Sequence, residues 1–128
     1  METQSLGDDR PQGLRVLVCG SRRLVDRGQV WERIDKFPRV PQTEIITGDA
    51  RGADDAAYWA ARCCNHPVRR FSADWKAHGK RAGIIRNLEM LDEQPDLVVA
   101  FWDGESRGTR HTIAEAERRG IPVEVIRS

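Results

Sequence analysis

Short apolar runs alternate with amphipathic segments along most of the chain. The five apolar runs fall at 14–20, 43–48, 67–71, 96–102 and 121–127. Each has the length of a β-strand, and the first and fourth are apolar enough for strands that are buried on both faces. The segments between the runs repeat their apolar residues at helical spacing. The sequence therefore predicts the element order βαβαβαβαβ.

Three of the predicted helices have a distinct apolar face. The first is closed by Pro38 and carries Val30, Ile34 and Phe37. The second has a stripe of small residues that allows close packing on a sheet, made of Ala56, Ala60, Cys63 and Cys64. The third follows a polar connection at 72–83, and its face consists of Ile84, Leu88 and Leu91.

This alternation is typical of a doubly wound α/β domain, in which helices cover both faces of a parallel sheet. We expect a single domain over residues 14–128, preceded by a loose polar tail over 1–13. If the two most apolar strands are central neighbours, right-handed crossovers give the strand order 3-2-1-4-5. The chain then reverses direction between the first and fourth strands, and ligands bind beyond the carboxyl ends of the strands at such a point.

Three glycine-containing loops are expected to meet there. They are CGSRR at 19–23, TGDARGAD at 47–54 and WDGESRGT at 102–109. Their glycines allow positive φ and close backbone approach, and the helices expected to start at Ala53 and Thr109 present unpaired N–H groups. Arginines in the same loops can clamp phosphate oxygens. Each loop alone also fits an ordinary turn, but three converging loops favour an anion site.

Composition restricts the function further. The 21 basic and 20 acidic residues nearly cancel, which argues against a nucleic-acid or membrane surface over the whole chain. Three cysteines, two of them adjacent, make no disulfide framework, so we expect a cytoplasmic protein. Cys63, Cys64 and His66 lack a fourth ligand at usable spacing, and we expect no metal site. Neither GxGxxG nor GxxxxGK[ST] occurs, which excludes the standard dinucleotide and P-loop fingerprints.

Four segments resemble a known family when they are taken in order. They are GSR at 20–22, ITGDARGADDAAYWA at 46–60, ADWKAHGKRAGIIRNLEM at 73–90 and DLVVAFWDGESRGTRHTIAEAERRGIPV at 96–123. Together they resemble the YspA-like branch of the SLOG superfamily, which includes the LOG phosphoribohydrolases and the Rossmann part of DprA. The resemblance implies a Rossmann-like fold that binds a nucleotide or nucleotide derivative, with Gly104, Gly108 and Thr109 on the phosphate side.

The resemblance also implies one catalytic candidate and shows one departure from the family pattern. Arg86 occupies a place similar to the arginine with which LOG enzymes release a base from a nucleoside monophosphate. The LOG glutamate after the glycine loop has no counterpart, because Arg110 and His111 stand there. Among the loop carboxylates, we interpret Asp54 as a ligand-holding residue, with catalysis as its alternative.

We therefore expect a ligand site built from all three loops and from the third helix. Its residues are Gly20, Ser21, Arg22, Gly48, Asp49, Arg51, Gly52, Ala53, Asp54, Trp75, Arg86, Asn87, Asp103, Gly104, Ser106, Arg107, Gly108 and Thr109. For Trp75, stacking on a base and packing in the core remain open alternatives. Trp102 is a second candidate for stacking.

Three functions remain, in order of preference. The first is a sensor or sequestering module for a nucleotide-derived molecule such as ADP-ribose, a nucleoside phosphate or a cyclic relative, with no cofactor required. The second is a hydrolase of an N-glycosidic or phosphate bond in such a molecule. The third, single-stranded nucleic-acid binding, is disfavoured by the balanced charge. The LOG resemblance implies a homodimer or higher homo-oligomer, to which Trp31 or Trp59 contributes if exposed. No segment is apolar enough to span a membrane.

Overall fold

The computed structural model describes residues 13–23 and 26–128, so residues 1–12 of the tail predicted over 1–13 lie outside the described residues. Five strands form one parallel sheet. They are β1 (Arg15–Gly20), β2 (Glu44–Gly48), β3 (Val68–Phe71), β4 (Leu97–Trp102) and β5 (Val123–Arg127). All five fall within the runs that the apolar pattern predicts.

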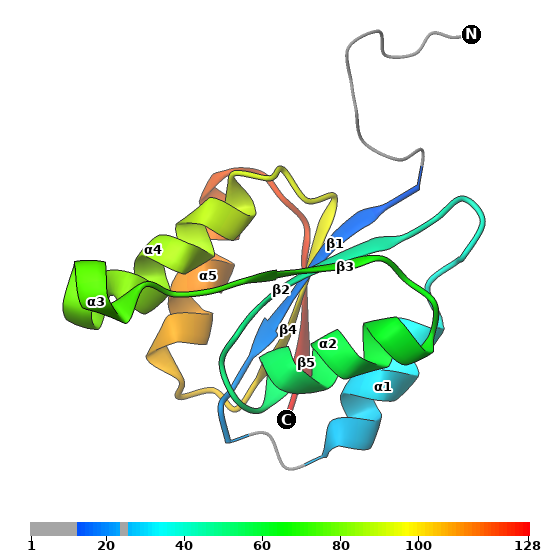
Figure 1. The fold of residues 1–128 in the computed structure, drawn as a ribbon, viewed down its shortest axis with the longest axis horizontal. Helices are drawn as coiled ribbons and strands as arrows, with labels where there is room; N and C mark the ends of the chain where they lie inside the picture. The colour runs from blue at the N-terminus through cyan, green and yellow to red at the C-terminus, as the bar shows by residue number, and fades with distance from the viewer. Residues whose placement is uncertain (1–12, 24–25) are drawn as a thin grey trace, which may run out of the picture.

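Helices cover both faces of the sheet. The α-helices are α1 (Arg27–Asp35), α2 (Ala53–Cys63), α3 (Trp75–His78), α4 (Ala82–Leu91) and α5 (Arg107–Arg118), and the 3-10 turn η1 (Gly79–Arg81) joins α3 to α4. In Figure 1, α1 and α2 lie on one side of the sheet, and α3, α4 and α5 lie on the other. This is the doubly wound arrangement that the alternation of elements predicts.

The strand order is β3-β2-β1-β4-β5, which confirms the predicted topology. β1 and β4 are central neighbours, with Val16 opposite Leu97 and Gly20 opposite Phe101. From β1 to β3 the chain adds strands on one side, and it then returns to β4 on the other side of β1. The carboxyl ends of β1 and β4 therefore form the switch point of the sheet.

The core has two layers because side chains alternate across each strand. In β1, Val16 and Val18 belong to the layer under α1 and α2, whereas Leu17 and Cys19 belong to the layer under α4 and α5. Burying each fully covered aliphatic side chain contributes about 1.5–3 kcal/mol. The predicted small-residue stripe of α2 packs on the first layer, although Cys63 itself is exposed and Ala57 and Ala61 complete the stripe.

The apolar face predicted for α4 is correct at Leu91, which is buried, and wrong at Ile84 and Leu88. Ile84 is 41% exposed and Leu88 is only half-buried, whereas Arg86 and Asn87 are buried at 6% and 8% exposure. The buried aliphatic side chains, Met90 and Leu91, lie in the last turn. The first half of α4 thus turns polar side chains inward. Among the described residues, no helix has the length and apolar character of a membrane span.

Candidate functional site

A cavity of about 550 Å³ opens at the switch point. The loops after β1 and β4 form one wall of it, and they are tied together by two hydrogen bonds. Ser21 donates its N–H to the carbonyl of Phe101 at 2.9 Å and its hydroxyl to Asp103 Oδ2 at 3.1 Å. Gly20 permits this contact, since a Cβ there would lie 2.4 Å from the Phe101 oxygen. The remaining walls come from α3, η1, α4 and α5.

The loop after β4 is folded around the carboxylate of Asp103. Oδ1 of Asp103 accepts the N–H groups of Glu105 and Ser106, both at 2.8 Å. These N–H donors hold the pKa of Asp103 below its ordinary value. Gly104, with φ of +86°, makes the turn between them. The loop therefore has a fixed shape that delivers the chain to the start of α5.

The first turn of α5 faces the cavity with Arg107, Gly108 and Thr109. The helix begins at Arg107, two residues before the predicted start, and its N-cap Ser106 makes no side-chain capping bond. Thr109 is not the cap; it is buried, with its hydroxyl 3.2 Å from that of Ser106. The N–H groups of this turn have no acceptor within the helix and carry partial positive charge. The predicted anion site would use these N–H groups as its donors.

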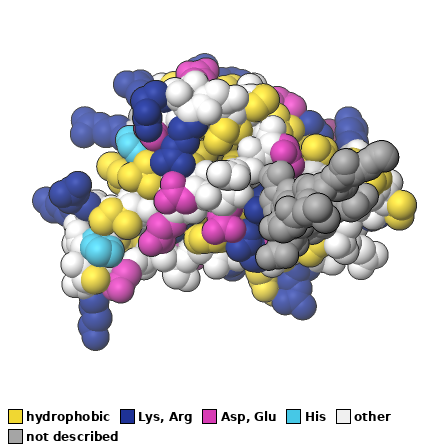
Figure 2. All heavy atoms as spheres, turned by 90° about the horizontal axis from the view of Figure 1, so that it is seen from above, with side chains coloured by type: hydrophobic (Ala, Val, Ile, Leu, Met, Phe, Trp, Pro, Cys, Tyr) yellow, Lys and Arg dark blue, Asp and Glu magenta, His cyan; other side chains and the backbone are white. Residues whose placement is uncertain are grey.

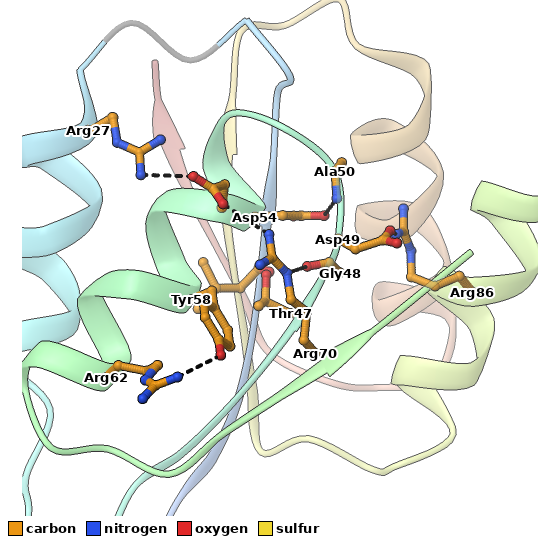
Figure 3. Close-up of polar contacts among 12 residues, drawn as sticks. Arg27, Thr47, Gly48, Asp49, Ala50, Asp54, Tyr58, Arg62, Arg70 and Arg86 are labelled. Atoms are coloured by element: carbon orange, nitrogen blue, oxygen red, sulfur yellow. Dashed lines mark hydrogen bonds and ion pairs between the residues drawn. The ribbon is translucent and has the colours of Figure 1, made fainter. Parts of the chain in front are cut away.

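A buried arginine forms the floor of the cavity together with Asn87. Nη1 of Arg86 lies 2.7 Å from Asp49 Oδ1, and its Nε donates to Asn87 Oδ1 at 2.9 Å. Figure 3 shows Arg86 and Asp49 pointing toward one another from α4 and the loop after β2. Because both hydrogen bonds fix the guanidinium, Arg86 presents a rigid cationic group to the cavity.

Asp54 lies beside this arginine and is 4% exposed. Its Oδ2 accepts the N–H of Ala50 at 3.2 Å (Figure 3). Burial raises the pKa of Asp54 from 3.8 to about 6, although the charge of Arg86 acts against the rise. A raised pKa means that this group stabilises the fold most below pH 3.8, and that the stabilisation is lost as pH rises through about 6. Asp54 therefore changes charge close to neutral pH.

Gly48 leaves the space that these two side chains occupy. A Cβ at this position would lie 2.5 Å from Asp54 Oδ2 and 2.7 Å from Arg86 Nη1. Both distances are far below van der Waals contact, so any larger residue would displace the pair. The carbonyl of Gly48 accepts Nε of Arg70 from the neighbouring strand at 3.2 Å (Figure 3). Arg70 thus holds the end of β2 on one side, and the missing side chain of Gly48 leaves room for Asp54 and Arg86 on the other.

The structure brings most of the predicted residues to one cavity. Those that line it are Gly20, Ser21, Arg22, Asp54, Trp75, Arg86, Asn87, Asp103, Ser106, Arg107, Gly108 and Thr109. Those that do not are Gly48, Asp49, Arg51, Gly52, Ala53 and Gly104. Asp49 and Gly48 support the site through Arg86 and Asp54. Arg51 is exposed away from the lining.

At the second predicted helix start, the N–H group of Ala53 already has an acceptor within the chain. Ala53 donates its N–H to the carbonyl of Ser21 at 3.1 Å, and its side chain is fully buried. Gly52, with φ of +77°, lets the loop pass against Ser21 and Arg22, where a Cβ would lie 2.3 Å from the Ser21 oxygen. The start of α2 thus serves to pack two loops together. By contrast, a Cβ on Gly108 would contact nothing within 4 Å.

Sequence reasoning missed several lining residues. They are Cys19, Arg23, Ala50, Lys80, Gly83, Ile84, Glu105 and Thr112. Lys80 lies in η1 and Ile84 lies in α4. The position of both residues at the cavity depends on the bend between these two elements. Arg23 and Glu105 are neighbours in sequence of predicted residues, and that adjacency is the signal that could have found them.

An apolar ledge borders the cavity next to α4. Trp75 is 50% exposed and lies against Gly83, where a Cβ would be 3.6 Å from the indole. Ile84 lines the cavity beside them. Trp75 therefore does not belong to the core, and this excludes the core-packing alternative for its side chain. Trp102 does not line the cavity; its indole N–H donates to the Ser106 carbonyl at 3.1 Å.

Fold and site together define a Rossmann-like α/β domain with a cavity at its switch point. Residues 14–78 match the model of the YspA, cpYpsA-related SLOG family. The chain is 44% identical over 116 residues to the Gene 61 protein of Mycobacterium phage D29, covering 85% of this chain and 93% of that one. The chain belongs to this SLOG family.

A solved structure shares the fold. DNA processing protein A (DprA) from Streptococcus pneumoniae superimposes with a TM-score of 0.70 at 19% identity. The match covers 91% of this chain and 51% of the DprA chain, so this protein spans about half of its neighbour's length. The likeness supports the Rossmann-like assignment of the fold.

Proposed function

We propose that the protein binds a nucleotide or nucleotide-derived small molecule in the cavity and acts as a sensor or sequestering module. One observation carries the proposal. A single cavity joins the first turn of α5, a buried Arg86 and Asp54 pair, and the half-exposed ring of Trp75. An anion site, a polar floor and an aromatic ledge suit the phosphate, ribose and base of one ligand.

Each part of such a ligand has a counterpart in the cavity. The phosphate accepts the N–H groups at the start of α5, with Ser106 and Thr109 as hydroxyl partners. The ribose hydroxyls donate to the carboxylate of Asp54, whose buried oxygens have few other donors. The base stacks on Trp75 and Ile84. Burial raises the pKa of Asp54 to about 6, but the charge of Arg86 opposes this rise and so favours the ionised form, which accepts hydrogen bonds.

The second candidate function is hydrolysis of an N-glycosidic or phosphate bond in the bound nucleotide. The raised pKa of Asp54, about 6, favours it, because a carboxyl that titrates near neutral pH is suited to proton transfer. The arrangement differs from the LOG pattern at the other end of the cavity. There Thr112 lines the site and donates its hydroxyl to the Gly108 carbonyl, and no carboxylate follows Thr109 directly.

Isothermal titration calorimetry with a panel of nucleotides tests the proposal, after native mass spectrometry has identified any ligand retained from expression. Gly108→Asp adds a carboxylate at the phosphate position without a clash. We expect it to weaken binding by at least about tenfold, since it places like charges together. Ala114→Asp is the matched control, because it adds the same charge to an exposed position of α5. Equal affinity of wild type and Gly108→Asp would contradict the phosphate assignment.

Turnover separates the sensor from the hydrolase. A ligand recovered unchanged after long incubation supports the sensor. Release of free base, or of inorganic phosphate, that Arg86→Lys or Asp54→Asn abolishes supports the hydrolase. Binding of single-stranded oligonucleotides that weakens steeply with salt would instead favour the third function, which the neighbouring DprA fold suggests.

The cellular setting and the assembly are also proposals. Three free cysteines fit a reducing cytoplasm. Trp31 and Trp59 are 37% and 46% exposed, and large exposed aromatic side chains are enriched at protein interfaces. We propose a homodimer that uses one of them. Light scattering of wild type and Trp59→Ser tests it, and a monomeric wild type would contradict it.

A further inference from the structure

We propose that the ligand carries at least two phosphate groups, as in a nucleoside diphosphate or ADP-ribose, and is not a nucleoside monophosphate. This inference rests on the proposed function and narrows its substrate class. It starts from four cationic side chains that line the cavity and make no ion pair with any carboxylate of the described residues. They are Arg22, Arg23, Lys80 and Arg107.

Outside the cavity lining, eight of the fifteen cationic side chains of the described residues pair with a carboxylate. Arg15 pairs with Glu44 at 2.7 Å, and Arg33 pairs with Glu124 at 2.8 Å. Figure 2 shows basic and acidic side chains interspersed over one face. A chain with a formal net charge of only +1 has little spare positive charge. Four unpaired cations around one cavity are therefore a local concentration, which attracts an anionic ligand.

The carboxylates that line the cavity offset the charge of its cations only in part. Asp103 is occupied by two N–H groups and by the Ser21 hydroxyl. Asp54 lies beside Arg86, which balances its charge. Glu105 alone remains as an exposed acid. Five cationic and three acidic side chains line the cavity in all, so the lining retains a positive excess.

The four cations come from three separate segments. Arg107 begins α5 and belongs to the same phosphate position as the N–H groups of that turn. Arg22 and Arg23 follow β1, and Lys80 projects from η1, before α4. One phosphate is already served by the α5 turn and Arg107. The cations of the other two segments line the same cavity and are available to a second, linked phosphate.

The experiment compares AMP, ADP and ADP-ribose by calorimetry on wild type and four variants. Lys80→Ala and Arg23→Ala each remove a lining cation, whereas Arg81→Ala and Arg51→Ala remove exposed cations that do not line the cavity. We expect ADP and ADP-ribose to bind at least about tenfold more tightly than AMP, as charge-assisted bonds to a second phosphate imply.

The variants should distinguish the contacts of the second phosphate from those of the first. Lys80→Ala and Arg23→Ala should weaken ADP binding about tenfold, leave AMP binding nearly unchanged and so erase the preference for ADP. The control variants should change the affinity for both ligands by less than about twofold, since their charges lie outside the cavity lining and are screened by solvent. All four substitutions are at exposed positions, and circular dichroism checks that each variant folds.

Three results would overturn the inference in different ways. Equal affinity for AMP and ADP in wild type would overturn it and leave the proposed function standing. No binding of any of the three nucleotides would overturn both. A preference for ADP that Lys80→Ala, Arg23→Ala and the controls all leave unchanged would also contradict it, because the second phosphate would then contact neither lining cation.

Discussion

Replacing Gly48 with alanine tests whether the floor of the site is built as the structure indicates. The new Cβ would lie 2.5 Å from Asp54 Oδ2 and 2.7 Å from Arg86 Nη1. Both side chains are nearly fully buried, and each is fixed by a hydrogen bond, to Ala50 and Asn87 respectively. Neither can move away without losing such a bond. One methyl group therefore displaces the polar floor of the cavity.

The expected cost follows from two opposing contributions. Overpacking a buried position and weakening hydrogen bonds to charged groups each cost about 1–3 kcal/mol. Alanine also recovers roughly 0.5–1 kcal/mol, because it loses less chain entropy than glycine on folding. Gly48 does not have positive φ, so its backbone accepts alanine without strain. We expect the free energy of unfolding to fall by about 1–5 kcal/mol in total.

The assay is urea unfolding at pH 7.5, followed by circular dichroism, with ligand binding measured in parallel. Gly108→Ala is the matched control for stability, since its Cβ meets nothing within 4 Å and its φ is not positive. That control should be unchanged, or up to about 1 kcal/mol more stable because alanine favours the helix. If Gly48→Ala is as stable as wild type and binds nucleotide equally well, the assigned floor is wrong.

Three further predictions concern single side chains. Burial raises the pKa of Asp54 to about 6, so wild type should lose about 3 kcal/mol of stability between pH 4 and 7 that Asp54→Asn retains; parallel pH profiles in urea unfolding would contradict this. Asp103→Ala should destabilise the fold by about 1–2 kcal/mol and weaken nucleotide binding, whereas Asp103→Asn keeps an acceptor and should lose less. Burial raises the pKa of the Cys19 thiol, so only exposed Cys63 should react quickly with a thiol reagent in the folded protein, and fast labelling of Cys19 would refute its burial.

The sheet could be predicted from the sequence because its physical cause is local and repeated. Strands buried on both faces must be apolar along their whole length. The runs that became β1 and β4 meet this condition, and they are the central pair. The short run that became β3 lies at an edge. Strand order then follows from handedness, which is nearly the same in all parallel sheets.

The orientation of α4, the third of the predicted helices, could not be predicted as well from its apolar pattern. Its aliphatic residues suggest a face through Ile84, yet that side chain is 41% exposed and lines the cavity. Periodicity assumes that the inward face of a helix meets the core. The first half of α4 instead passes beyond the carboxyl ends of the strands, where the inward direction leads to the ligand cavity. The sequence around a helix start also does not determine which of its N–H groups remain unpaired, because residues distant in the sequence can accept them. Ala53 is an example, since it donates its N–H to the carbonyl of Ser21.

The inward position of Arg86 is itself an argument for a ligand. A buried arginine held between carboxylates stabilises a fold less than apolar side chains of similar volume would. Burial raises the pKa of Asp54 to about 6, so the charged form of this residue is disfavoured in the folded chain. Local patterns and global fold agree almost everywhere else in this chain, and they disagree at the mouth of one cavity. Such disagreements are expected at functional sites, where a bound partner supplies the interactions that the free protein lacks.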